Sequence, residues 1–244
     1  MGISIKTNDD LSLVATEFLP VVATGLEYAN FFGSSGVMAR NLATGKSAAS
    51  VVGSPVQNTQ FIRCEGGVSF IQTAALQTAE YTLIAVAKPV TDSVTETAAM
   101  ISNNSGNVFA KVSLDFLQST LGDGVLNARH ATATDLGGGT FGEDNQTAVG
   151  VANLTTPKAY AARFNSSRLK VFNRLTDGAL TSTTQATALG VDPTKPLRLG
   201  SSYQSIGDTD IYCAFIYSRS LSDVELASIY AQIKAYYTAR SITI

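Results

Sequence analysis

The sequence contains few charges and few of the residues that carry enzyme chemistry. It has one histidine, two cysteines and no tryptophan among 244 residues, and the net charge is only -2. A charge so close to zero gives no general electrostatic attraction to nucleic acid or to anionic membranes. No apolar run approaches the length of a membrane span, and the first residues lack the pattern of a secretory signal. We therefore expect no nucleic-acid binding and no membrane insertion, in a protein made in a cytoplasm.

Histidine and cysteine are too scarce to build most nucleophilic or zinc sites. His130 is the only histidine, and residues 128–131 have neither the glycine elbow nor the ligand spacing that such sites need. Cys64 and Cys213 do not form a disulfide framework, and buried free cysteines behave as small hydrophobic residues. A disulfide between Cys64 and Cys213 is the alternative, if their strands are neighbours. We predict no catalytic residues and a protein that is not an enzyme.

A glycine-rich run, residues 136–142, lacks the features of a phosphate-binding loop. It contains no Lys-Ser/Thr pair and does not open a helix, and Glu143 and Asp144 directly after it would repel phosphate. We interpret the run as a long flexible connection between strands. The alternative is a rim loop that contacts a glycan or a neighbouring subunit.

Asp208 and Asp210 form the one run with acids at alternate positions that is comparable to a glycosidase centre. The run lacks a third acid, and Gly207 indicates a turn, so hydrolysis is a minor alternative. The same two carboxylates could contribute to a calcium site, but a hard cation needs more oxygen ligands than two acids supply. We predict no metal and no cofactor.

From residue 37 onward, many short β-favouring runs are separated by turn residues, which is typical of a sandwich or barrel. The run at 81–87 is almost continuously apolar and predicts a central strand covered on both faces. The runs at 159–164 and 169–172 are joined by a three-residue polar turn and predict a hairpin. The predicted strands are 60–64, 68–71, 81–88, 98–102, 108–112, 125–131, 148–154, 158–164, 168–174, 196–200 and 210–217.

A single helix is predicted after the last strand. Ser222 is a good N-cap, Glu225 three residues later completes a capping box, and Asp223 places a negative charge in the first turn. Apolar residues then recur at helical spacing and form one face. These are Leu226, Ile229, Tyr230, Ile233 and Tyr237.

The end of the chain resembles the C-terminal signature of laminin-G-like and concanavalin A-like jelly-roll domains. The matching residues are Pro196, Leu197, Leu199, Gly200, Tyr217, Arg219, Leu221, Ser222, Asp223 and Glu225. Upstream, residues 41–55, 68–73 and 81–89 resemble the early strands of the family, so the resemblance covers residues 37–240. It implies an all-β, antiparallel two-sheet jelly-roll sandwich with one C-terminal helix. The tryptophan and the paired calcium-binding acids of many members are absent here.

Standalone proteins of this type, rich in Ala, Thr, Ser and Gly, resemble bacteriophage virion proteins. We therefore expect a non-catalytic structural or adhesive protein of a phage particle, in capsid decoration or associated with the tail. Its localisation would be the virion, and its partners other virion proteins and a host-surface glycan. The alternatives are a carbohydrate-binding module of a bacterial protein and, less favoured, a glycoside hydrolase of the same fold.

Tyr203, Gln204 and Asp208 form the most site-like group in the chain. Sugar sites combine an aromatic platform with hydrogen-bonding amides, and these residues lie on a predicted loop after a strand. The alternative is a tyrosine that only supports a turn. We predict Tyr203, Gln204, Asp208 and Asp210 as ligand-binding residues.

The two ends of the chain suggest self-association. Residues 1–36 fit the sandwich pattern poorly and predict an N-terminal arm or edge segment beside a domain at 37–244, with Phe31 and Phe32 as a packed anchor. Residues 18–22 and 241–244 could add a strand to a neighbouring subunit or cover its surface. They could equally fold back on their own sandwich. We expect a homo-oligomer.

Overall fold

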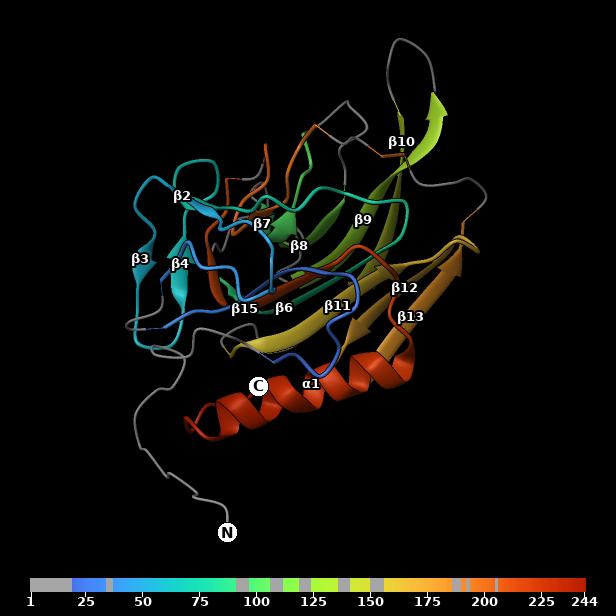
Figure 1. Cartoon of the computed structure of the whole chain (residues 1–244). Helices are drawn as coiled ribbons and strands as arrows, with labels where there is room; N and C mark the ends of the chain where they lie inside the picture. The colour runs from blue at the N-terminus through green and yellow to red at the C-terminus, as the bar shows by residue number, and fades with distance from the viewer. Residues whose placement is uncertain are drawn as a thin grey trace.

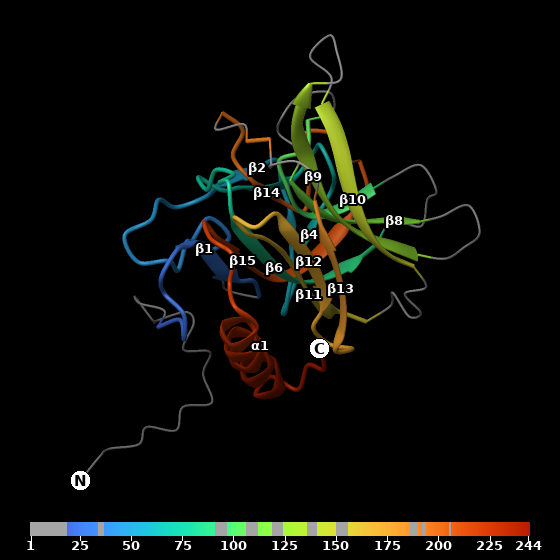
Figure 2. The same ribbon diagram turned by 90° about the vertical axis from the view of Figure 1, so that its right-hand side faces the viewer.

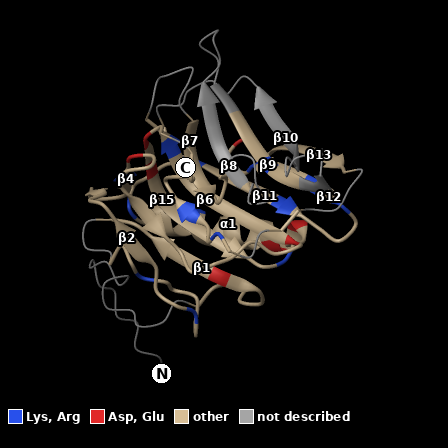
Figure 3. Cartoon of the chain, turned by 90° about the horizontal axis from the view of Figure 1, so that it is seen from above, with Lys and Arg blue, Asp and Glu red and all other residues tan. Residues whose placement is uncertain are grey.

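The chain folds into two packed antiparallel sheets and one helix, which confirms the predicted jelly-roll sandwich (Figure 1). The computed structural model describes residues 19–33, 37–90, 97–105, 112–118, 124–135, 141–149, 156–185, 190–191, 194–204 and 206–244. The helix α1 lies against one sheet, on the side away from the other sheet, in both side views (Figure 2). Charged residues are few and scattered over the strands (Figure 3).

The larger sheet has eight strands within the described ranges, and all its pairs are antiparallel. Their order is β13 (Ala179–Thr184), β12 (Leu169–Arg174), β11 (Lys158–Phe164), β6 (Tyr81–Pro89), β15 (Thr209–Tyr217), β4 (Ile62–Cys64) and β3 (Val56–Gln57). The eighth strand, β1 (Leu26–Phe31), pairs with the second half of β15 on the side where β4 pairs with its first half. Strand β15 is therefore central to this sheet.

The smaller sheet has seven strands in the part of the chain that the structure describes. Their order is β10 (Phe141–Val149), β9 (Gly124–Asp135), β8 (Ser113–Gln118), β7 (Thr97–Ser102), β14 (Arg198–Leu199), β5 (Phe70–Gln72) and β2 (Ser50–Val52). The two-residue strand β14 pairs with β7 on one side and with β5 on the other. The start of the predicted C-terminal signature is thus a central strand of this sheet.

Strand β6 is covered on both faces, as its apolar run predicts. Leu83 and Ala85 point into the core between the sheets, whereas Ile84 and Val86 point into a second core beneath the helix. All four side chains are fully buried. Because successive side chains of a strand point to opposite faces, only a strand between two apolar layers can bury a continuous apolar run.

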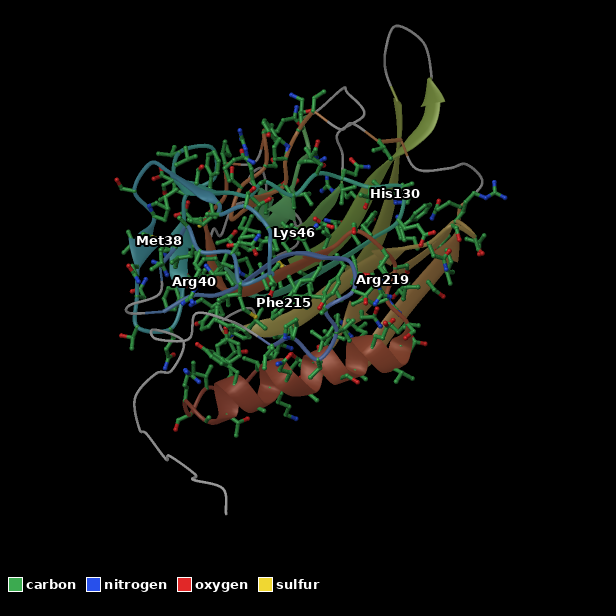
Figure 4. The ribbon with its side chains drawn as sticks, in the orientation of Figure 1. Met38, Arg40, Lys46, His130, Phe215 and Arg219 are labelled. Carbon is green, nitrogen blue, oxygen red and sulfur yellow. The ribbon has the colours of Figure 1, made fainter. Side chains whose placement is uncertain are left out.

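The helix α1 (Asp223–Thr238) begins at the predicted cap. The Ser222 hydroxyl accepts a hydrogen bond from the Glu225 backbone N–H, and the Glu225 side chain accepts one from the Ser222 N–H, which confirms the capping box. The predicted apolar face contacts the sheet through Leu226, Ile229, Ile233 and Tyr237, with Tyr230 partly buried beside them. Phe215 of β15 contributes its side chain to the core under this helix (Figure 4).

The hairpin between β11 and β12 is also confirmed. The Asn165 N–H donates to the Leu169 carbonyl at 3.2 Å, and the Arg168 N–H donates to the Asn165 carbonyl at 2.9 Å. Arg168 has φ 63°, the left-handed conformation that a turn followed by a bulge requires. An arginine there is strained relative to glycine.

The cysteines are not bridged although their strands are neighbours. Cys64 on β4 points into the core between the sheets, and Cys213 on β15 points into the core under the helix, so the sheet itself separates the two thiols. Both are free and buried, and burial raises the pKa of each to about 12. They act as small apolar residues.

Several strands differ from the sequence predictions. Residues 141–149, expected to include the end of a loop, form β10, whose backbone pairs with β9. Strands β2, β3 and β13 are exposed over most of their length, including the apolar residues Val51, Val52, Val56 and Leu180, so their positions are set by backbone pairing and not by burial of an apolar face. Most of the predicted strands 108–112 and 148–154, and the glycines of 136–140, lie outside the described residues.

The described parts of both chain ends lie on the same molecule. The Val21 N–H donates to Gln232 of α1 at 3.2 Å, and the Tyr217 hydroxyl donates to the Val22 carbonyl at 3.0 Å. Ile244 is buried in the core under the helix. Residues 241–244 therefore take the second of the two arrangements expected for them and fold back on their own sandwich, with Ile244 buried and Ile242 partly buried.

The start of the chain is only partly described. Phe31 and Phe32 are buried and confirm the predicted anchor. Strand β1 lies within the larger sheet, on the N-terminal side of the boundary expected at residue 36. Residues 1–18 lie outside the described part, so the arm and the division of the chain at residue 36 stay predictions. No helix of the described residues is long and apolar enough to cross a membrane.

Candidate functional site

The candidate site is built on β14 and on the loop that follows it. Leu199 points into the core between the sheets, so its neighbour Arg198 points to the outer face of the smaller sheet. Gly200 follows with φ 73°, and its Cα faces Cys64 so closely that an added Cβ would lie 2.2 Å from the Cys64 Cβ. This left-handed turn brings residues 201–204 back over the outer face.

Arg198 contacts two aromatic rings there. Its guanidinium carbon lies 3.4 Å from the centroid of the Tyr203 ring and 4.4 Å from that of Phe70. Its Nε donates to Gln72 Oε1 at 2.9 Å, and a terminal nitrogen donates to the Ser202 carbonyl at 3.0 Å. The guanidinium is thus held in one orientation by stacking and by hydrogen bonds from two directions.

Tyr203 is the centre of this group. Its hydroxyl donates to the Pro196 carbonyl at 3.3 Å, and its backbone N–H donates to the Asn104 carbonyl at 2.8 Å. The Lys195 ammonium lies 4.8 Å from the centroid of its ring. We call Phe70, Gln72, Lys195, Arg198 and Tyr203 the Arg198 cluster.

The Arg198 cluster carries two positive charges that pair with no acid of the described residues. In the part of the chain that the structure describes, no ion pair within 4 Å involves Arg198 or Lys195. Partial burial lowers the pKa of Arg198, since moving the charge out of water is unfavourable, but an arginine stays protonated at neutral pH. The cluster therefore presents two cations beside an aromatic ring.

The four residues predicted from sequence fall into two places. Tyr203 belongs to the Arg198 cluster, and Gln204 next to it is exposed, with its backbone N–H donating to Ser202 Oγ at 2.9 Å. Asp208 is partly buried and lies on the segment that connects β14 of one sheet to β15 of the other. Its backbone carbonyl accepts a hydrogen bond from the Val90 N–H at 2.9 Å. Asp210 is on the other sheet.

Asp210 is fully buried and forms ion pairs. Its carboxylate accepts from Arg63 at 2.7 and 3.0 Å, and the Lys88 ammonium lies 3.3 Å away. Strand alternation puts these three side chains on the outer face of the larger sheet, because Ile62, Ala87 and Ile211 point inward. The hydrogen bonds to Asp210 raise the pKa of Arg63. We call Arg63, Lys88 and Asp210 the Asp210 cluster.

The remaining polar residues in the core do not form a second open site. His130 on β9 is fully buried, with its ring 4.9 Å from that of Phe164 (Figure 4). Lys170 is also fully buried, and its ammonium lies 3.4 Å from the Ala128 carbonyl. Within the described ranges, no three His, Cys, Asp or Glu side chains come together in a way that could hold a metal ion.

One cleft of about 190 Å³ lies between the end of α1 and the tail, far along the chain from the predicted site. Lys234 is its only charged lining side chain, and the others are Thr238, Ser241, Ile242, Thr243 and Ile244. None of the predicted ligand-binding residues lines it. The Arg198 cluster lies elsewhere, on the outer face of the smaller sheet, with Phe70 buried and its other members partly buried.

Sequence reasoning found Tyr203 but missed its neighbours. Arg198 lies inside the recognised signature, where its alternation with Leu197 and Leu199 indicates an outward side chain. Phe70 and Gln72 come from β5, more than a hundred residues earlier in the chain. Only the pairing of β14 with β5 brings them beside Arg198.

The fold is similar to that of botulinum neurotoxin binding domains. The serotype D binding domain has a TM-score of 0.57 at 13% identity, over 86% of this chain and 52% of that one. The binding domain of botulinum neurotoxin DC has 0.58 at 8% identity with the same coverage, and a type C structure has 0.59 at 7%, over 86% and 51%. This chain spans about half the length of each. No family model and no curated protein matches it.

Identities this low show a shared fold alone. The chain is an all-β, two-sheet sandwich with the fold found in those binding domains. Its possible chemistry must be argued from its own surface, where the Arg198 cluster combines aromatic, amide and cationic groups.

Proposed function

We propose that this protein is a non-catalytic glycan-binding protein whose ligand contacts the Arg198 cluster. The observation that carries the proposal is the position of Tyr203, whose ring meets two cations, Arg198 and Lys195, on the outer face of the smaller sheet. Sugars present C–H groups that pack on aromatic rings and hydroxyls that bond amides and cations.

The structural neighbours support the same class of function. The serotype D domain is described in complex with N-acetylneuraminic acid, the DC domain in complex with SialylT, and entry of type C into cells as dependent on two ganglioside molecules. These neighbours are receptor-binding domains of toxins. They favour binding over catalysis for a sandwich of this shape, although this chain corresponds to only half of each.

The alternative of glycoside hydrolysis has less support. A glycosidase of this kind needs two carboxyl groups that face one sugar. Asp210 is fully buried and its carboxylate is engaged by Arg63 and Lys88, so its oxygens are directed at cations of the protein. Binding without bond cleavage is therefore the favoured function.

Glycan-array binding followed by calorimetry tests the proposal. Tyr203→Ala should weaken binding of the best glycan about tenfold, because it removes the stacking surface and the support of Arg198. Tyr230→Ala on α1 is the matched control and should leave affinity unchanged. Thermal melts of both variants establish that they fold. Absence of binding to every glycan on the array would overturn the proposal.

A role in a bacteriophage particle is the second proposal, and it rests on the composition and on the resemblance of the C-terminal signature. The protein would be a structural or adhesive component of the virion, with other virion proteins as partners, and glycan binding would attach the particle to its host. Mass spectrometry of purified virions tests this. Stoichiometric presence supports it, and absence contradicts it.

Self-association through the N-terminal segment completes this proposal. Deletion of residues 1–18 leaves the contacts of Leu19 and Val21 with Gln232 in place, so the sandwich should still fold. If the segment is an interface element, light scattering should show an oligomer for the full chain and a monomer for the shortened one. A full chain that is already monomeric at micromolar concentration contradicts it.

A further inference from the structure

We infer that the Arg198 cluster recognises a carboxylate, so that the ligand is an acidic sugar such as a sialic or uronic acid. This inference rests on the proposed glycan-binding function and specifies its ligand class. It starts from the geometry around one guanidinium group and from the charges that surround it.

The guanidinium retains hydrogen-bond donors that face no acid of the described protein. Arginine has five N–H donors in one plane. The single Nε donor is used by Gln72 Oε1, one donor of a terminal nitrogen is used by the Ser202 carbonyl, and the guanidinium also forms a side-chain hydrogen bond with Tyr203. The donors that remain belong to the two terminal nitrogens, which form the edge that pairs with both oxygens of a carboxylate.

The surrounding contacts fix the direction of approach. Tyr203 and Phe70 contact the guanidinium through their rings, at 3.4 and 4.4 Å between the guanidinium carbon and the ring centroids. Ring contacts occupy the flat faces of the group and leave its edge for hydrogen bonding. A ligand acid that pairs with this edge therefore has an arginine that is already oriented, which reduces the entropy lost on binding.

The charge balance favours a negative ligand. Other arginines of the described residues, including Arg63, Arg163 and Arg219, form ion pairs with acids. Arg198 and Lys195 have no such acid within 4 Å in the described ranges, yet both are partly buried around one tyrosine. Partly desolvated cations gain more from a counter-ion than exposed ones do, so a carboxylate of the ligand would supply the missing partner.

A sugar acid fits this surface better than a polyanion. The chain has a net charge of -2, which gives no long-range attraction to nucleic acid or a sulfated polymer. Two cations around one ring match a single carboxylate on a sugar ring.

Calorimetry with paired ligands tests the inference. The methyl glycosides of N-acetylneuraminic acid and glucuronic acid would be compared with their methyl esters, which have no charge and cannot form the fork. The wild-type protein should bind at least one acid about tenfold or more tightly than its ester. Raising the ionic strength should weaken binding of the acid and leave the ester unaffected.

Variants assign the effect to Arg198. Arg198→Lys keeps the positive charge but removes the two-point hydrogen bonding of the guanidinium. It should lower the affinity for the acid about tenfold and leave the affinity for the ester unchanged. Arg240→Lys is the matched control, since Arg240 also lies over a tyrosine ring, at 3.7 Å from the centroid of Tyr236. Should Arg198→Lys fail to fold, Lys195→Gln is the second variant and should weaken binding of the acid about threefold.

The outcomes separate the two proposals. If neutral glycans or the esters bind as tightly as the acids, and Tyr203→Ala still weakens binding, the carboxylate inference is wrong and glycan binding stands. If the acid binds but Arg198→Lys and Arg240→Lys behave alike, the assignment to Arg198 is wrong. If no glycan binds at all, both proposals fall.

Discussion

Two arginines on opposite outer faces of the sandwich have contrasting surroundings. Arg63 forms a two-point pair with the fully buried carboxylate of Asp210, which Lys88 also contacts, and the hydrogen bonds raise the pKa of Arg63. Arg198 contacts aromatic rings and neutral oxygens, and burial lowers its pKa. The Asp210 cluster pairs its cations with its own carboxylate, whereas Arg198 and Lys195 form no ion pair within the described ranges.

This difference separates a structural site from a binding site. A buried carboxylate with two cations stabilises only when all three are present, so it responds to mutation through stability. A cation held by rings and amides keeps its orientation without an acid, so it responds through affinity. Four variants test this contrast, from the largest expected effect to the smallest.

Gly200→Ala should cause the largest loss of protein stability. Gly200 follows the strand that holds Arg198, and it packs against Cys64, the neighbour of Arg63. Its φ of 73° disfavours a side chain, and the new Cβ would lie 2.2 Å from the Cβ of Cys64, the neighbour of Arg63. We expect the free energy of unfolding to fall by about 3 kcal/mol in urea titrations. Gly45→Ala has the same φ and open space around it, so it should cost about 1 kcal/mol. Equal losses in the two variants would contradict the packing argument.

Asp210→Asn tests whether the Asp210 cluster is purely structural. Removing the buried charge leaves Arg63 and Lys88 without their partner, and we expect the free energy of unfolding to fall by about 2 kcal/mol. Asp177→Asn breaks the more exposed pairs with Lys158 and Arg174 and should cost under about 1 kcal/mol. Glycan affinity should stay unchanged in both variants. A selective loss of binding in Asp210→Asn would assign Asp210 to the binding site instead.

The third prediction concerns how much the ion pair between Arg219 and Glu225 contributes to the stability of this protein. Hydrogen bonds from Arg219, together with those from Ser222, lower the pKa of Glu225 to about 2. A depressed folded-state pKa contributes stability that is present above pH 4.5 and lost as the pH falls towards 2. Because the pair is partly exposed, the loss attributable to Glu225 should be about 1 kcal/mol.

Unfolding titrations of the wild type and of Glu225→Gln at several pH values test this. The difference in stability between the two proteins should shrink as the pH falls from 5 to 2, since the protonated wild type resembles the variant. The change should accompany loss of the cap contacts at Ser222. A difference that stays constant with pH would contradict the pairing.

Arg168→Gly should have the smallest effect, and it should be stabilising. Arg168 has φ 63° in the turn after β11, where glycine is not strained. We expect a gain of about 0.5 kcal/mol in the free energy of unfolding. Arg168→Ala keeps the strain and is the control for loss of the side chain. Glycan affinity should not change, which separates Arg198 from arginines in general. A loss of stability in the glycine variant would mean that the Arg168 side chain stabilises the hairpin.

The elements with strong local signals were predictable. The capping box at Ser222 and Glu225, the apolar face of α1 and the apolar run of β6 each depend on side chains close together in the sequence. The strands without such signals were missed. Exposed β13, for example, shows no apolar alternation and is fixed by its pairing with β12.

The candidate site was only partly predictable for the same reason. Tyr203 and Gln204 could be proposed from a turn after a strand, and Asp210 from its spacing to Asp208. The structure places Asp210 on the larger sheet and Tyr203 on the smaller one. The chain crosses between the sheets at Gly207, whose backbone pairs with β7. Residues a few positions apart can therefore face opposite sides of a sandwich.

The sequence by itself determined the fold class and the position of the helix. These depend on composition and on spacings within one element. Only the tertiary structure decided which basic side chains form an ion pair with an acidic side chain. Arg63 meets Asp210 and Arg198 meets Phe70 because strands far apart in the chain pair side by side, and such contacts are set by the packing of the whole sandwich.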